Sequence, residues 1–413
     1  HLNLSQTRPK RPERGAPPTA RPAMELTLAT AGLLPAPLRT SPIGRLATER
    51  WLAAESDASL SWCDEPRGGR QQYAFWRWLS VGSGTLALPA ADQRTLSDLL
   101  EMHALLPPSE GFAPLPDDAP VRGLRRTAAS EEPPPAATAA ATTAAASAIA
   151  LPPEELARTR TAAWVRRTLS PLGMRFCPYT ASAEVSGSGL ESFGVRPAPI
   201  AYAHSEAGSV ASLLVDFWAA ACGMTEGGEE SVSSIVLSAP SWDERWGEWH
   251  RTVFPLLEAS VLAAGLGRTL GIVCFHPQYE TPSDAWLARH RFGHMHSPSK
   301  LRRYLREHDA ALAASSSESD LRWAGSYQRR SPHALINVLW ARQLEAAERR
   351  RKSSSLYTRN IRAALEAGRD SLEAERRRER GELTAELAPP RPPSAGPPQL
   401  EPLPQPQQPQ QQP

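Results

Sequence analysis

With 413 residues the chain could form two or three domains, but 41 prolines, about one residue in ten, exclude a chain that folds throughout. The formal charge of +2, from 46 basic and 44 acidic residues, excludes a polycation that binds nucleic acid through its overall charge. Four widely spaced cysteines exclude a disulfide scaffold, and the lack of a long, strongly apolar run excludes a membrane-spanning helix, so we expect neither a nucleic-acid nor a membrane partner.

Residues 1–45 have the composition of an organelle transit peptide. They are rich in arginine and hydroxyl side chains and contain two acidic residues, Glu13 and Glu25. Transit peptides share this shortage of acids, while the missing apolar region argues against a secretory signal. We therefore expect a disordered leader that directs the chain to the chloroplast. The alternative is an ordinary disordered tail on a cytoplasmic protein.

Residues 46–106 are predicted to form a small helical segment, an N-terminal extension of the main domain. Leucines recur at helical spacing in Thr95–Leu106, and tryptophans are frequent before this stretch. We expect the aromatic side chains to pack in a small core or against the main domain rather than to bind a ligand. Residues 107–153 are predicted to be a linker, because their proline, alanine and threonine offer too little apolar surface to offset the loss of chain entropy.

The main domain is predicted over residues 154–370, where helical and strand patterns alternate. This alternation favours an α/β fold with a small, mostly parallel central sheet covered by helices. The predicted strands are Ile200–His204, Ser234–Pro240 and Gly271–Phe275. The predicted helices are Glu154–Thr168, Val210–Ala221, Trp242–Ala264, Ser331–Glu348 and Tyr357–Ala367.

The C-terminal end is predicted to consist of two polar segments. Residues 371–387 mix arginine and glutamate at the i, i+4 spacing of a solvated, charged helix. Residues 388–413 are rich in proline and glutamine without periodicity, which predicts a disordered tail.

Three short motifs place a reactive or charged side chain directly before a proline or one residue earlier. They are F-C-P-Y with Cys177, F-H-P-Q-Y with His276 and Tyr279, and R-R-S-P-H with Arg330 and Ser331. His276 follows a predicted buried strand, and open α/β sheets bind ligands beyond the carboxyl ends of their strands. We therefore expect His276 at the ligand-binding edge of the sheet, with Tyr279 as a further candidate in the same motif.

Ser331 and Pro332 have the pattern of a helix start. Serine is a favoured N-cap, proline is a favoured first helical residue, and a helix N-terminus attracts anions through its free N–H groups. With Arg330 beside it, this pattern predicts a site for a small anionic ligand. The alternative is that Pro332 stabilises the helix and Arg330 is solvated.

Cys177 is the candidate nucleophile. A thiolate forms readily where a helix terminus, an arginine or a histidine lowers the pKa of the thiol, so this role requires Arg330 or His276 nearby. Without such a neighbour, Cys177 is a small apolar side chain of the core.

The main domain resembles the DUF1415 family, a domain family of unknown function found in bacteria and photosynthetic eukaryotes. The resemblance covers residues from about 159 to 370 and rests on motifs at Cys177–Tyr179, Ser234–Pro240, Phe275–Tyr279, Arg330–Pro332 and Tyr357–Ile361. It implies a plant or algal type of member with extensions at both ends. It implies no reaction, because the family has no established activity.

Residues between Glu280 and Arg322 resemble an insertion relative to that family. This segment carries His290, His294 and His296 in the spacing H-x-x-x-H-x-H. Histidines one helical turn apart can bind zinc, although no acidic or cysteine ligand follows at close spacing. The three histidines therefore define a metal-binding alternative.

Two other hypotheses remain open for the main domain. In the enzymatic one, Cys177, His276 and Arg330 converge on one pocket, where Arg330 and Ser331 hold an anionic group. His276 then acts as acid or base, and Cys177 acts as nucleophile or redox thiol. In the other, the same motifs are structural turns of a non-catalytic binding or assembly module. The sequence alone identifies no cofactor, oligomeric state or protein partner.

Overall fold

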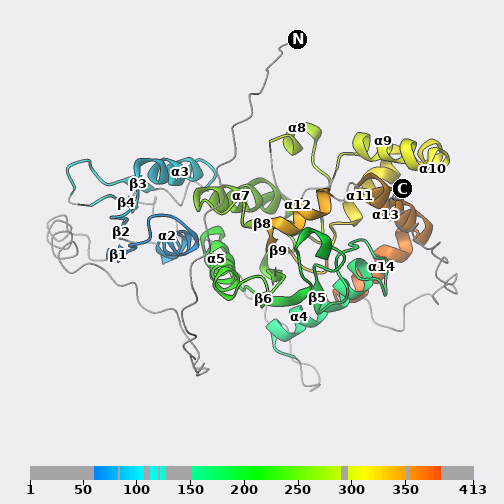
Figure 1. Cartoon of the computed structure of the whole chain (residues 1–413), viewed down its shortest axis with the longest axis horizontal. Helices are drawn as coiled ribbons and strands as arrows, with labels where there is room; N and C mark the ends of the chain where they lie inside the picture. The colour runs from blue at the N-terminus through cyan, green and yellow to red at the C-terminus, as the bar shows by residue number, and fades with distance from the viewer. Residues whose placement is uncertain are drawn as a thin grey trace, which may run out of the picture. The chain divides into compact units, whose positions relative to one another are not determined.

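The computed structural model describes seven stretches of the chain, which Figure 1 shows in colour. They are residues 60–81, 84–106, 112–119, 121–126, 151–289, 296–349 and 353–382. The predicted leader at 1–45, the predicted tail at 388–413 and most of the predicted linker lie outside these residues.

Four short strands form a sheet in the N-terminal part of the described chain. In sheet order they are β1 (Leu60–Trp62), β2 (Thr85–Ala87), β4 (Gly123–Arg126) and β3 (Phe112–Pro114). β1 and β2 are parallel, and β4 runs antiparallel to both of its neighbours. Two helices are described in this region, α2 (Gly69–Val81) and α3 (Gln93–His103), and they follow β1 and β2 in the chain.

This sheet corrects two sequence predictions. The segment 46–106, predicted to be helical, also contributes β1 and β2. The segment 107–153, predicted to be a linker, contributes β3 and β4. Strands of three or four residues are too short to show a clear alternating pattern, and a proline within a strand resembles a loop signal.

Aromatic side chains join the N-terminal sheet to the main domain. Phe75, Trp76 and Trp78 on α2 are buried, and Phe75 meets Phe112 of β3 edge to face, with 5.3 Å between the ring centroids. The same hydrophobic cluster includes side chains of α5 (Val210–Gly227), and α2 packs along α5. The packing role predicted for these aromatic residues is therefore confirmed.

The main domain contains a five-stranded sheet. Its order is β5 (Val185–Ser186), β6 (Ala198–His204), β7 (Ser234–Ser238), β9 (Leu335–Trp340) and β8 (Leu270–Phe275). β6 and β7 are parallel, whereas β9 runs antiparallel to both β7 and β8, and β5 runs antiparallel to β6. The predicted α/β class is confirmed, but the sheet is mixed rather than mostly parallel.

β9 lies within the helix predicted at Ser331–Glu348. The helix of this region, α12 (Ala341–Arg349), begins only after the strand. Apolar residues surround Asn337 throughout Ala334–Trp340, and periodicity cannot distinguish a short apolar strand from a buried helix. The strand prevails because its backbone hydrogen bonds are satisfied along both edges, by β7 and by β8.

Helices cover both faces of the main sheet. α5 and α7 (Phe254–Ala263) pack on one face, in a cluster that includes Ile235 and Ile272. α4 (Pro153–Trp164) and the π-helical turn Val165–Leu169 lie on the other face.

The helix predicted at Trp242–Ala264 begins later, at Trp246, and contains a π-helical turn. A 3-10 turn at Pro240–Trp242 precedes it, and it consists of α6 (Trp246–Glu248), the π-helical turn at Trp249–Val253, and α7. Pro255, near the start of α7, has no N–H to donate to the preceding turn, which accounts for the altered hydrogen-bonding pattern before it.

Most of the remaining helices lie together at the right of Figure 1, whereas α8 is drawn apart from them. The remaining helices are α8 (Asp284–Leu287), α9 (Pro298–His308), α10 (Ala310–Ser315), α11 (Glu318–Tyr327), α13 (Ser353–Ala367) and α14 (Arg369–Glu379). α9, α11 and α13 share a second hydrophobic cluster, which includes Leu301, Leu321 and Ile361. Within the described ranges, no helix has an apolar stretch long enough to cross a membrane.

Candidate functional site

A cavity of about 700 Å³ lies on the face of the main sheet that α4 covers. All five strands of the main sheet contribute residues to its lining, among them Ile200, Val236, Asn337 and Val273. Its walls come from the π-helical turn after α4, from the loop 176–180, and from α9, α12 and α13. Cavities of this size hold small organic ligands.

Arg329 brings an unpaired positive charge to this cavity. Its guanidinium lies over the ring of Phe275, 5.0 Å from the centroid, and its buried Nε finds no hydrogen-bond partner in the described part of the chain. Within the described residues its guanidinium forms no ion pair. A guanidinium carries five N–H donors in a planar fork, which suits a carboxylate or a phosphate.

His296 and Lys300 add basic groups to the cavity wall. The His296 ring contacts the Tyr357 ring, with 4.6 Å between the centroids. Burial, together with the charges of Lys300 and Arg329, lowers the pKa of His296 to about 4. The imidazole of His296 is therefore neutral near neutral pH, and the positive charge in the cavity comes from Arg329 and Lys300.

Two carboxylates also line the cavity. They belong to Asp284 of α8 and Glu348 of α12, and both residues are exposed. Solvent screens exposed charges much more than buried ones. The acidic groups therefore offset the charge of the half-buried Arg329 only weakly.

Cys177 lines the same cavity with a half-buried side chain. The F-C-P-Y loop that carries it is held in place at the residue before it. The N–H of Phe176 donates to the carbonyl of Thr168 at 3.0 Å, and Nδ2 of Asn360 donates to the carbonyl of Phe176 at 2.9 Å. The loop is thus fixed to both the π-helical turn and α13.

The other three cysteines are poorly placed for reaction. Burial raises the pKa of Cys63 and Cys222 to about 11, and that of Cys274 well above its ordinary value. A thiol reacts as the thiolate, so these side chains react slowly near neutral pH. Cys177 is the cysteine that lines the cavity.

His276 lies at the end of β8, as predicted, but outside the cavity. It is fully buried, its Nε2–H donates to the carbonyl of Trp242 at 2.9 Å, and its Nδ1 accepts from the N–H of Gln278 at 3.0 Å. Its ring also packs against Trp246 and Trp249. Both ring nitrogens are engaged, so His276 joins the end of β8 to the helical segment 242–249 instead of serving as an acid or base.

The bonding of His276 predicts a pH dependence of stability. Burial lowers the pKa of His276 to about 4 from 6.5. If Nδ1 were protonated, its N–H would face the N–H of Gln278, and the hydrogen bond between them would be lost. In the unfolded chain, His276 binds this proton with the ordinary pKa of 6.5. The contribution of the neutral His276 to the free energy of unfolding is therefore complete above pH 6.5 and is lost as the pH falls towards 4. A His276→Gln variant does not titrate and its amide N–H can donate to the carbonyl of Trp242, so we expect a flatter profile of unfolding free energy in urea. An identical profile in both proteins would contradict this role.

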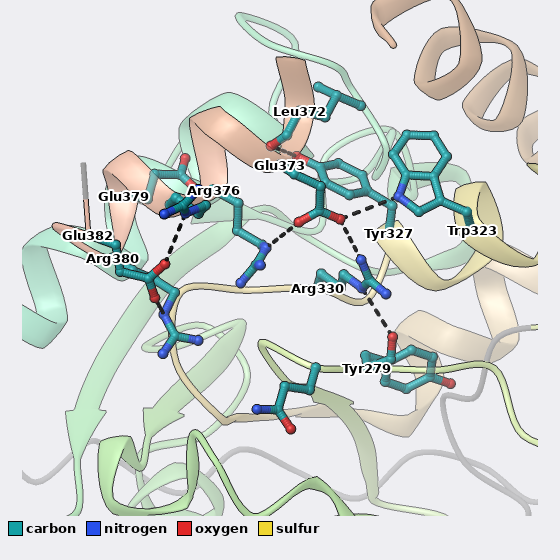
Figure 2. A network of polar contacts seen from close by, with 12 residues as sticks. Tyr279, Trp323, Tyr327, Arg330, Leu372, Glu373, Arg376, Glu379, Arg380 and Glu382 are labelled. Atoms are coloured by element: carbon teal, nitrogen blue, oxygen red, sulfur yellow. Dashed lines mark hydrogen bonds and ion pairs between the residues drawn. The ribbon is translucent and has the colours of Figure 1, made fainter. Parts of the chain in front are cut away.

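Arg330 holds the C-terminal helix, as Figure 2 shows. Its guanidinium forms an ion pair with Glu373 of α14, and its Nε donates to the carbonyl of Tyr279 at 3.2 Å. Glu373 also accepts from Arg376 at 2.8 Å and from the indole N–H of Trp323 at 3.3 Å. The charge of Arg330 is neutralised within the chain, so the predicted anion site is not built around it.

The helix start predicted at Ser331 is wrong, because β9 follows instead. The buried Ser331 hydroxyl donates to the carbonyl of His333 at 2.6 Å. Asp243 accepts from the N–H of Ala334 at 2.7 Å and from Nδ1 of His333 at 2.8 Å. These bonds fix the chain as it enters β9, so Ser331 offers no helix N-terminus to an anion.

Of the residues singled out in the three motifs, Cys177 alone lines the cavity. The residues outside it are His276, Tyr279, Arg330 and Ser331. Tyr279 is buried, with its ring 5.1 Å from that of Trp246. The predicted convergence of Cys177, His276 and Arg330 on one pocket therefore does not occur.

Of the three histidines in the metal-binding alternative, the structure describes only His296. His290 and His294 lie outside the described residues, and His296 lies in the cavity wall. The described part of the chain contains no group of three side chains that could hold a metal ion. A site that includes His290 and His294 stays a prediction.

Sequence reasoning missed Arg329, Lys300 and Asn337. Arg329 precedes Arg330 directly, and only the fold decides which of the two arginines faces the cavity. Asn337 did leave a signal, because it interrupts an otherwise apolar run.

The fold and the cavity define an α/β protein with room for a small organic molecule on its main sheet. Comparisons with protein-family models, with curated proteins and with solved structures find no match to this chain. The resemblance to the DUF1415 family therefore stays a prediction from the motifs.

Proposed function

We propose that this chain binds a small organic anion in the cavity on the main sheet. The observation that carries the proposal is the guanidinium of Arg329, which lines the cavity and makes no hydrogen bond or ion pair within the described residues. Burying a cation without a partner costs free energy, and a bound carboxylate or phosphate would offset that cost. Lys300 would add a second positive charge.

The rest of the cavity suits an organic anion better than an inorganic one. Apolar side chains cover much of the floor and one wall, including Trp164, Val236, Val273, Phe275 and Leu339. Apolar surface of a ligand gains free energy when it leaves water for such a surface. Apolar walls with a few polar groups are typical of small-molecule sites.

Chemistry at Cys177 stays a prediction. The thiol lines the same cavity as Arg329, as the enzymatic hypothesis requires of a nucleophile. His276, its predicted acid or base, has both ring nitrogens engaged outside the cavity. This difference favours a binding site over the predicted catalytic arrangement.

Alkylation of Cys177 tests the proposal. Iodoacetate and iodoacetamide form the same kind of thioether, but only iodoacetate is an anion. Because Arg329 would attract the carboxylate, we expect the ratio of the iodoacetate rate constant to the iodoacetamide rate constant to be about tenfold higher in the native chain than in the urea-unfolded chain. Mass spectrometry of the labelled peptide measures both rate constants at Cys177.

Two variants serve as controls for this experiment. Cys177→Ser should lose the label, and Arg329→Met should bring the ratio down to that of the unfolded chain. Equal ratios in the native and unfolded wild-type chain would contradict anion binding in the cavity.

A further inference from the structure

Asn337 lies in the middle of the cavity floor. In the strand register it stands between Val236 of β7 and Val273 of β8, and Leu335 and Leu339 are its neighbours on the same face of β9. Its side chain lines the cavity, and its buried Oδ1 has no hydrogen-bond partner among the described residues. An unpaired polar atom thus lies within an apolar surface.

An unpaired amide oxygen at this position destabilises the free protein. A buried acceptor without a donor carries a desolvation penalty that an aliphatic side chain would avoid. Asn360, the other asparagine of the cavity, is different, because its Nδ2 donates to the carbonyl of Phe176 and to Oε1 of Gln328, both at 2.9 Å. The fold explains Asn360, whereas no described residue donates to the acceptor of Asn337.

Asn337 and Arg329 act at separate points of the cavity. The guanidinium of Arg329 lies over Phe275, and Phe275 is two residues beyond Val273, which pairs with Asn337. Diagonal neighbours of this kind in a sheet are roughly 7–8 Å apart. A ligand that uses both groups must therefore carry its hydrogen-bond donor several atoms away from its anionic group.

We infer that the ligand is an amphipathic organic acid with a hydroxyl or amine donor remote from its anionic group. The anionic group binds Arg329, the apolar body lies on Phe275 and Val273, and the donor hydrogen-bonds to Oδ1 of Asn337. This inference rests on the proposed function, because it takes Arg329 as the anion-binding group. It excludes α-hydroxy acids as preferred ligands, since their donor is adjacent to the carboxylate.

Four arylacetic acids test the inference on the full chain. 4-Hydroxyphenylacetate has a remote donor, phenylacetate has none, 4-methoxyphenylacetate has a remote acceptor only, and mandelate has its hydroxyl beside the carboxylate. We expect 4-hydroxyphenylacetate to bind about three- to tenfold more tightly than the other three acids. One hydrogen bond to a neutral acceptor accounts for a difference in affinity of this size. Calorimetry or ligand-observed NMR measures the four affinities.

Asn337→Leu separates a ligand-binding role from a structural one. We expect this variant to lose the preference for 4-hydroxyphenylacetate and to have a higher Tm than the free wild-type chain. Asn360→Leu is the matched control, and it should have a lower Tm because it breaks three hydrogen bonds, two donated by Nδ2 and one accepted by Oδ1 from Arg359. A lower Tm for Asn337→Leu, or an unchanged preference, would overturn the inference.

The same measurements distinguish the inference from the proposed function. Equal binding of all four acids, with each affinity reduced in Arg329→Met, would overturn the inference and leave the anion site in place. A preference for mandelate would also overturn it. If none of the acids binds the wild-type chain at millimolar concentration, the proposed function fails as well.

Discussion

Replacing Arg330 with methionine is expected to lower the free energy of unfolding by about 2 kcal/mol. The side chain joins the end of α11 to α14 through Glu373 and satisfies the carbonyl of Tyr279 (Figure 2). Although burial opposes it, the hydrogen bond from Arg376 and the charge of Arg330 keep the pKa of Glu373 below its ordinary value. The variant would therefore remove one partner from the charged carboxylate of Glu373 and one from the carbonyl of Tyr279. Unfolding in urea measures the resulting loss of free energy of unfolding.

An exposed ion pair provides the control for this substitution. Arg349 pairs with Glu345 at 3.4 Å one helical turn away, and both side chains are more than half exposed. Such pairs contribute little, so Arg349→Met should change the free energy of unfolding by less than about 0.5 kcal/mol. Equal losses in Arg330→Met and Arg349→Met would contradict a structural role for Arg330.

Replacing Arg329 with methionine is expected to lower ligand affinity but not stability. Arg329→Met removes a buried, unpaired donor and loses a cation–π contact with Phe275. We expect the free energy of unfolding to stay unchanged or to rise by up to about 1 kcal/mol. Affinity for an organic acid should fall by roughly 30-fold, which corresponds to about 2 kcal/mol from a lost charge-assisted contact.

The two neighbouring arginines thus form a matched pair for experiment. Unfolding curves and binding isotherms of both variants are compared with those of the wild-type chain. Arg330→Met should lose stability, while the chains that remain folded still bind the acid. Arg329→Met should keep stability and lose binding. A loss of stability in Arg329→Met as large as that in Arg330→Met would mean that Arg329, too, is structural.

The α/β class could be predicted because several elements have clear local patterns. β6, β7 and β8 are apolar runs with helices between them, and the structure confirms all three strands. β9 could not be predicted from local pattern, because its apolar run fits a buried helix equally well, and pairing with β7 and β8 decides the outcome. The four short N-terminal strands are likewise set by tertiary pairing.

The error at β9 also displaced the predicted site. A helix starting at Ser331 would have directed attention to its N-terminus and to Arg330, whereas the strand leaves Ser331 buried and Arg330 bound to α14. His276 was correctly expected at a strand end, yet its hydrogen bonds to Trp242 and Gln278 could be known only from the fold. Cys177 and His296 are the predicted site residues that do line the cavity, and only the fold could show that they lie beside Arg329 there.

The most direct test of the anion site compares 4-hydroxyphenylacetate with its neutral amide, 4-hydroxyphenylacetamide. The two molecules differ in charge and very little in shape, so their difference in affinity isolates the contribution of the anionic group. We expect the acid to bind the wild-type chain at least about tenfold more tightly than the amide, and this difference to disappear in Arg329→Met. Equal affinities of the wild-type chain for the acid and the amide would contradict the anion site.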